Sequence, residues 1–150
     1  MQCDSCEIKN LIYRYADYLD RGDLDAVVAL LKGGRLIALM ADGGESEIIG
    51  ERAIHDMYRS FTRLYEDNGT PHTLHMTTNI TVEVAEGGLS ASSRSYAVVF
   101  QALDDFPLQP IIGVRYYDRF SKTAEKWAFD ERKIESYLLG DLSRHLLQPI

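Results

Sequence analysis

Several features that would point to familiar protein classes are scarce or missing from this sequence. It has only two cysteines, Cys3 and Cys6, and a zinc site of four thiolates needs two more. We therefore expect two reduced thiols near the start of the chain. No apolar run approaches the roughly 18 residues of a membrane span, and the first residues lack a basic segment followed by an apolar one. These absences predict a cytoplasmic protein with no membrane partner.

Basic residues are also in the minority. The chain has 16 Lys and Arg against 23 Asp and Glu, which gives a formal net charge of −7. A surface of this sign repels the phosphates of nucleic acid, so we expect no nucleic-acid partner. The 150 residues, of which 45% are hydrophobic, are typical of one globular domain, and we predict a single domain over residues 1–150.

The motifs of common enzyme classes are missing as well. The sequence contains no G-x-G-x-x-G, no Walker loop, no G-x-S-x-G and no H-E-x-x-H, which argues against nucleotide binding and the usual hydrolases. His72 and His75 are three residues apart, so on a strand they face opposite ways and form a poor metal pair. We therefore expect no metal and no cofactor.

Hydrophobic periodicity divides the chain into two parts. Apolar residues at helical spacing predict helices over about 5–21, 23–31 and 51–65, with a short strand at 35–40. From residue 73 the period changes to two, which predicts four long strands over 73–84, 89–103, 111–122 and 126–137. Long strands joined by tight turns indicate an antiparallel meander. The predicted fold class is α+β, with a curved antiparallel sheet around three N-terminal helices and a cavity between the first helix and the sheet.

A few polar residues are candidates for chemistry. Asp20 ends the first predicted helix, where the negative end of the helix dipole disfavours a carboxylate by about 0.3–1 kcal/mol. A partner for Asp20 is therefore expected, and His75 is a candidate because an Asp–His dyad provides a general base at neutral pH. The alternative is that His75 is a surface residue on the polar face of its strand, beside Thr77 and Asn79. Arg132 would either form a rim salt bridge or stabilise developing negative charge.

Three segments together resemble a known family. IKNLIYRYADYLDRGDLDAVVALL, HTLHMTTNITVEV and GVRYYDRFSKTAEKWAFDERKIES, followed by GDLSRHL, are similar to the SnoaL-like branch of the nuclear transport factor 2-like superfamily. At key points they also resemble lindane dehydrochlorinase, scytalone dehydratase and bile acid 7α-dehydratase. The resemblance implies a cone-shaped α+β fold. It also implies catalytic roles for Asp20, His75 and Arg132.

The resemblance further implies a reaction class. We expect a cofactor-free lyase or isomerase, of dehydratase or dehydrohalogenase type, acting on a small hydrophobic cyclic molecule. The family contains non-catalytic ligand-binding or assembly modules and small β subunits of ring-hydroxylating dioxygenases, and these remain alternatives. A homodimer or homotrimer is expected from the same resemblance. Candidate substrate-binding residues are Tyr15, Tyr58, Asn79, Tyr96 and Tyr116.

Overall fold

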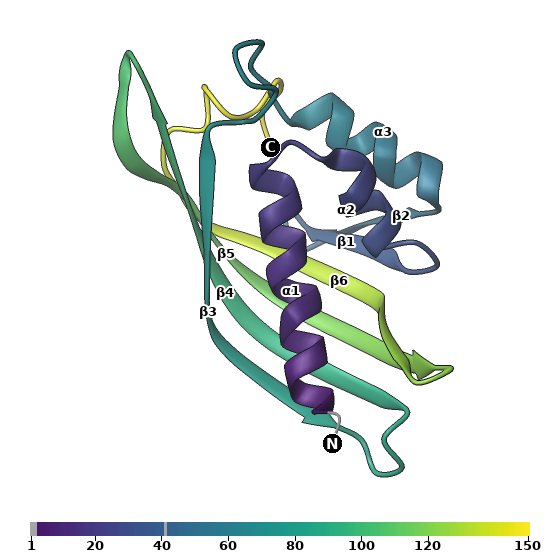
Figure 1. Ribbon diagram of the computed structural model, residues 1–150. Coiled ribbons are helices and arrows are strands. Elements are labelled where there is room, and N and C mark those ends of the chain that lie inside the picture. The colour runs from purple at the N-terminus through teal and green to yellow at the C-terminus, as the bar shows by residue number, and fades with distance from the viewer. Residues whose placement is uncertain (1–2, 41) are drawn as a thin grey trace.

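The longest helix lies across the concave face of a curved sheet (Figure 1). The computed structural model describes residues 3–40 and 42–150, and its first helix, α1, spans Asp4–Asp20. Residues at helical spacing form its buried stripe, because positions three and four apart share one face. They are Ile8, Ile12, Tyr15, Ala16 and Leu19. The first of the predicted helices is therefore present, and its buried side packs into the core.

The two cysteines differ from the expectation of reduced thiols. Cys3 and Cys6 are joined in a disulfide. Cys3 is also the N-cap residue of α1, and its sulfur accepts a hydrogen bond from the backbone N–H of Cys6. Residues three apart in a first helical turn lie on the same side of the chain, and this brings the two sulfurs together.

Two shorter helices pack beside the end of α1. Helix α2 spans Leu24–Leu30 and is capped by Asp23, which accepts a hydrogen bond from the backbone N–H of Ala26 at 3.0 Å. Helix α3 spans Glu51–Phe61, four residues shorter than predicted. The chain leaves the helix at Thr62, whose backbone is extended and which bridges to Leu146 near the C-terminus.

Six strands form one open sheet in the order β2-β1-β6-β5-β4-β3. Their bounds are Arg35–Leu39 for β1, Glu45–Ile49 for β2, Thr73–Val84 for β3, Ser90–Leu103 for β4, Phe106–Thr123 for β5 and Lys126–Leu139 for β6. The four long strands pair antiparallel in chain order, as predicted. The short strand β1 runs parallel to β6, so the sheet as a whole is mixed. Strand β2 was not predicted, since four of its five residues are exposed and its sequence carries no buried alternation.

The outermost long strand turns its polar face inward. His75 faces α1, whereas Leu74 and Met76 on the opposite face are 56% and 55% exposed. A bulge between Thr78 and Thr81 then reverses the alternation. After the bulge, Ile80 packs against the core. The predicted alternation of β3 is present, but the face that carries His75 is the inner one.

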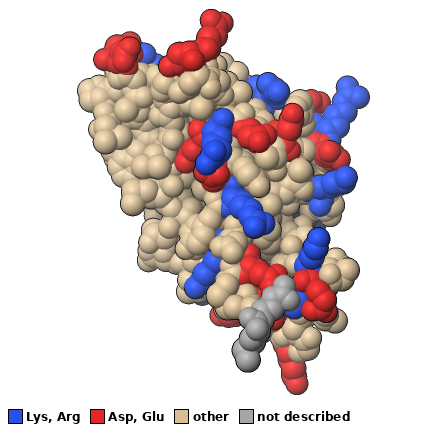
Figure 2. All heavy atoms as spheres, viewed as in Figure 1, with Lys and Arg blue, Asp and Glu red and all other residues tan. Residues whose placement is uncertain are grey.

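Charged side chains of both signs are mixed on the face of the molecule that Figure 2 shows. Lys and Arg side chains in Figure 2 lie among Asp and Glu side chains and form no single basic face in that view. None of the helices within residues 3–40 and 42–150 is long and apolar enough to cross a membrane.

The α+β class and the curved sheet are confirmed, with α1 lying in the concavity.

Candidate active site

The carboxylate of Asp20 is held by three hydrogen bonds from β3. It accepts one from the hydroxyl of Thr73 at 2.8 Å and one from the backbone N–H of His75 at 2.8 Å. The third joins Asp20 Oδ1 to His75 Nδ1 at 2.6 Å. Each bond to the ionised carboxylate stabilises its charge, and together they oppose the unfavourable end of the helix dipole. The sequence-based expectation of a partner for Asp20 thus has a structural counterpart.

This arrangement defines the state of the imidazole. The side chains of His75 and Asp20 are only 7% and 17% exposed. Because an ionised carboxylate can only accept, Nδ1 of His75 carries the hydrogen and donates the hydrogen bond to Asp20. Nε2 is then the nitrogen left to accept a proton. An Asp20 charge held against the ring also stabilises the imidazolium that proton uptake would form.

Arg132 lies deep in the core and pairs with a residue that the sequence did not indicate. Its Nε and Nη2 donate to the two oxygens of Asp118 at 2.9 Å and 2.8 Å, and both side chains are fully buried. Burial disfavours the charge, yet the Asp118 carboxylate more than compensates and raises the pKa of Arg132 above its ordinary value. The alternative of a rim salt bridge is replaced by this buried pair.

Two of the predicted tyrosines lie against that guanidinium, and a third is bonded to one of them. The Cζ atom of Arg132 lies 3.9 Å from the ring centre of Tyr116 and 4.2 Å from that of Tyr15. The hydroxyls of Tyr15 and Tyr58 are 2.6 Å apart and share a hydrogen bond. Burial raises the pKa of all three phenols, which are therefore neutral at physiological pH. The space predicted as a cavity between α1 and the sheet holds these rings.

The Arg132 pair leaves one donor unused. Nη1 of Arg132 is buried, and no residue that the structure describes accepts a hydrogen bond from it. An unpaired donor on a buried cation is costly, because it has lost water without gaining an acceptor. Nη1 is therefore a ready donor to an oxygen or halide of a bound molecule.

Two predicted substrate-binding residues lie elsewhere. Tyr96 is 39% exposed and stacks with Arg115 on the convex face, because it alternates with the buried Ser95 and Ala97. Asn79 sits in the β3 bulge with a positive φ of 54° and is exposed, with its side-chain oxygen bonded to the Thr78 hydroxyl. The structure does not bring either residue to Asp20 and His75.

Three residues near these groups were missed. Asp118 faces Arg132 directly in the β5–β6 register, and that pairing depends on a bulge that the sequence does not reveal. Thr73 shares a strand face with His75 and could have been found by alternation. His145 stands in the C-terminal segment, far along the chain from the dyad, yet the charges of His75 and Asp20 both affect its pKa.

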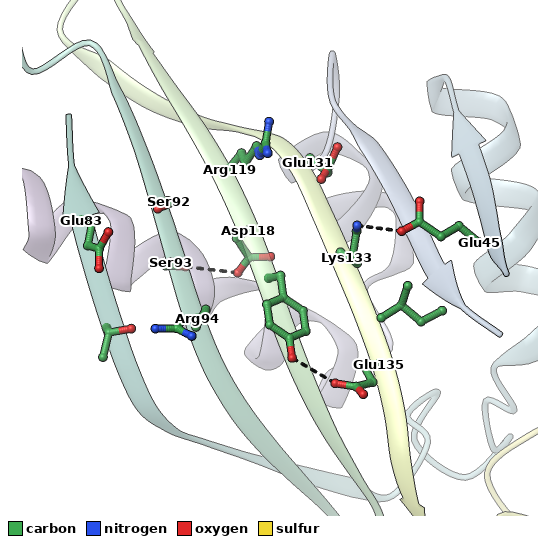
Figure 3. Close-up of a pocket in the computed structure, with 13 residues that line it drawn as sticks. Glu45, Glu83, Ser92, Ser93, Arg94, Asp118, Arg119, Glu131, Lys133 and Glu135 are labelled. Carbon is green, nitrogen blue, oxygen red and sulfur yellow. Dashed lines mark hydrogen bonds and ion pairs between the residues drawn. The ribbon is translucent and has the colours of Figure 1, made fainter. Parts of the chain in front are cut away.

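A hollow lies on the opposite face of the sheet. Figure 3 shows this outer groove, of about 580 Å³, crossed by the ion pair between Lys133 and Glu45 at 2.8 Å. A second hollow, of about 440 Å³, lies beside His55. Neither is lined by Asp20, His75 or Arg132. Among the described residues no group of three His, Cys, Asp or Glu side chains is placed to hold a metal ion.

Comparison with known proteins identifies the family. A SnoaL-like domain matches residues 3–133. The chain belongs to the SnoaL-like family. None of the curated proteins matches the sequence.

Solved structures with the same fold include three proteins from Novosphingobium aromaticivorans. An NTF2-like protein with a cystatin-like fold is 22% identical, with a TM-score of 0.69 and coverage of 89% of this chain and 81% of that one. A candidate scytalone dehydratase is 18% identical, with a TM-score of 0.69 and coverage of 92% and 87%. A candidate aromatic ring hydroxylase is 22% identical, with a TM-score of 0.69 and coverage of 95% and 99%. At these identities the similarity shows the shared fold.

Proposed function

We propose that this SnoaL-like protein is a cofactor-free lyase or isomerase for a small hydrophobic cyclic substrate, with His75 as general base. The observation that carries the proposal is the 2.6 Å contact between His75 Nδ1 and Asp20 Oδ1 in a largely buried setting. An imidazole oriented by a carboxylate is a standard arrangement for removing a proton at neutral pH. The match to a candidate scytalone dehydratase is consistent with this class.

The proposed reaction begins at His75 Nε2. This nitrogen takes a proton from a carbon next to an electron-withdrawing group, while Asp20 stabilises the imidazolium. In an elimination, the electrons of the broken C–H bond form a double bond as halide leaves, or as hydroxide leaves and takes a proton from the imidazolium to become water. In an isomerisation, they form an enolate that takes the proton back at another carbon. Both outcomes use the same first step.

Arg132 and the tyrosines would act on the other end of the substrate. As negative charge develops on an oxygen or halide, Nη1 of Arg132 and a neutral phenol such as Tyr15 or Tyr58 can donate to it. The aromatic rings around Arg132 provide apolar contact for a ring-shaped molecule. A substrate must displace these side chains from their mutual contacts, so binding is expected to rearrange them.

Hydrogen exchange into an enolisable ketone tests the first step without knowledge of the natural substrate. Native protein should speed the exchange of the ring protons next to the carbonyl of cyclohexanone in D₂O, followed by proton NMR. His75→Gln should lower that rate by about 10²–10⁴. His55→Gln is the matched control, because His55 lies at the surface, beside Asp25 and Asp56. Exchange that is equally fast in His75→Gln would refute the general-base role.

A second candidate is a non-catalytic ligand-binding or assembly module, which includes the role of a ring-hydroxylating dioxygenase β subunit. The observation that favours it is the exposure of Leu74 and Met76 on the convex face, since exposed apolar side chains on a sheet are suited to association. We propose that this face pairs copies of the chain as a homodimer or homotrimer. Light scattering of native protein and Leu74→Lys tests the pairing, and native protein that is inactive in the exchange assay would favour the module.

A further inference from the structure

The segment that follows β6 is fixed against the end of the fold where Asp20 and His75 lie. In Figure 1 it is the yellow chain that passes between the β4–β5 hairpin and α3. Backbone hydrogen bonds attach it to the end of α3 and the segment that follows: Arg63 donates to the His145 carbonyl at 2.9 Å, and Leu147 donates to the Phe61 carbonyl at 2.9 Å. The position of His145 is thus set by backbone contacts on both sides.

Two contacts place this segment next to the dyad. Gln101 donates to the Arg144 carbonyl at 3.1 Å, and Gln101 is the register partner of Thr73, the residue whose hydroxyl binds Asp20. Leu142 packs against the cluster that contains Val99, and Val99 is the register partner of His75. The segment therefore approaches Asp20 and His75 from the β4 side.

The side chain of His145 is neutral, so one of its two ring nitrogens is an acceptor and the other a donor. Burial lowers the pKa of His145 to about 4, with a further lowering from the charge of His75 and an opposing effect from Asp20. Nδ1 of His145 is buried, and the residues that the structure describes provide no hydrogen-bond partner for it. A buried polar atom in this state has lost its water and gains free energy from any ligand group that restores a hydrogen bond.

We propose that His145 is a substrate-binding residue whose Nδ1 accepts a hydrogen bond from a hydroxyl group of the substrate. The inference rests on the proposed function, because it takes the space beside His75 as the substrate site. It narrows the substrate class to cyclic molecules that carry a hydroxyl. Nη1 of Arg132 is a buried group without a partner that can only donate, whereas a hydroxyl hydrogen needs an acceptor. In the tautomer that carries its proton on Nε2, His145 supplies that acceptor through Nδ1.

The test compares two ligands that differ by one hydroxyl. The probes are cyclohexanone and 4-hydroxycyclohexanone, whose hydroxyl is too far from the carbonyl to leave after proton removal at the neighbouring carbon. Native protein should bind the hydroxylated ring about 3- to 10-fold more tightly in an NMR titration, the range expected for one net hydrogen bond. His145→Leu should abolish the preference.

Two variants separate a specific role from a structural one. His145→Asn should retain part of the preference, because its amide oxygen can occupy the place of Nδ1. His55→Leu should retain all of it, since His55 lies beside Asp25 and Asp56 on a different surface. Thermal unfolding confirms that each variant is folded before its titration.

The possible outcomes are distinct from those of the exchange assay. Equal affinity for both rings in native protein overturns the proposal, and so does a preference that persists in folded His145→Leu or disappears in folded His145→Asn. Binding is read at equilibrium and needs no proton removal. A protein that prefers the hydroxylated ring but does not catalyse exchange would refute His75 as base and leave His145 as a ligand-binding residue.

Discussion

The low pKa of His145 makes the stability of this protein depend on pH in a defined window. Burial lowers the pKa of His145 from 6.5 to about 4, so between these values the unfolded chain binds a proton that the folded chain does not. Unfolding then takes up a proton, and the free energy of unfolding falls as the pH falls. The contribution of neutral His145 is complete above about pH 6.5 and is lost progressively down to about pH 4.

The magnitude follows from the shift. Each pKa unit corresponds to about 1.4 kcal/mol, so a change from 6.5 to about 4 corresponds to a loss of roughly 3 kcal/mol across the window. Carboxylates with lowered pKa values lose their contribution only at lower pH, because their ordinary pKa is 3.8. They are Asp4, Asp67, Asp105 and Asp141.

Urea unfolding at several pH values measures this loss. Native protein and His145→Asn are compared at about pH 7, 5.5 and 4.2, and the difference between them isolates the histidine from all other titrating groups. We expect the native free energy of unfolding to fall by roughly 3 kcal/mol more than that of the variant. His55→Asn serves as the control for the loss of a histidine at the surface. Parallel curves for native protein and His145→Asn would show that His145 titrates normally, and the reasoning would fail.

Three substitutions test other contacts by urea unfolding. Asp118→Ala should lower the free energy of unfolding by about 3–5 kcal/mol, because it leaves the Arg132 charge buried without a partner; adding Arg132→Met should recover part of that loss. Gly22→Ala should lower the free energy of unfolding by at least about 3 kcal/mol. A Cβ at this position would lie 2.1 Å from the Gly69 carbonyl oxygen, and Gly22 has a φ of +71°. Thr73→Val removes one hydrogen-bond donor to Asp20 and should lower the free energy of unfolding by about 1 kcal/mol. The same variant should slow hydrogen exchange into cyclohexanone by up to about tenfold.

Each of these has a result that would contradict it. A double variant less stable than Asp118→Ala alone would show that Arg132 is not left as an uncompensated charge. For Gly22, the control is Gly87→Ala, whose φ is +93° but whose Cβ would meet no atom within 4 Å. Equal costs at both glycines would mean that backbone conformation, and not the Gly69 contact, sets the effect. An unchanged exchange rate in Thr73→Val would separate Thr73 from the proposed chemistry.

Local patterns were sufficient for most elements and for one contact of the site. The apolar spacing of α1 and the alternation of the long strands predict the helices and strands that form the layers, because those periods are properties of the isolated segments. The placement of Asp20 at a helix end made a partner necessary, and His75 is that partner in the structure. Whether this pair is catalytic stays a prediction, as do the cytoplasmic location and the oligomeric state.

Errors arose where one residue changes the register. The β3 bulge around Asn79 exchanges the two faces of that strand, so Asn79 lies outside the site and Ile80 joins the core. Tyr96 was assigned by residue type alone, although its neighbours Ser95 and Ala97 take the inner positions. A side-chain period of two gives the alternation but leaves open which face is buried when the outer face also carries apolar residues.

The sequence by itself determined the α+β order of elements and the position of the Asp20 carboxylate at a helix end. The small number of histidines also left few candidates for a general base, His75 among them. Only the tertiary structure decided that Arg132 pairs with Asp118, because this depends on the register of β5 against β6. It also placed the C-terminal segment that carries His145 against Gln101 of β4, the register partner of Thr73. Contacts between residues distant along the chain leave no periodic signal, and these contacts fix which buried groups are paired and which remain free for a ligand.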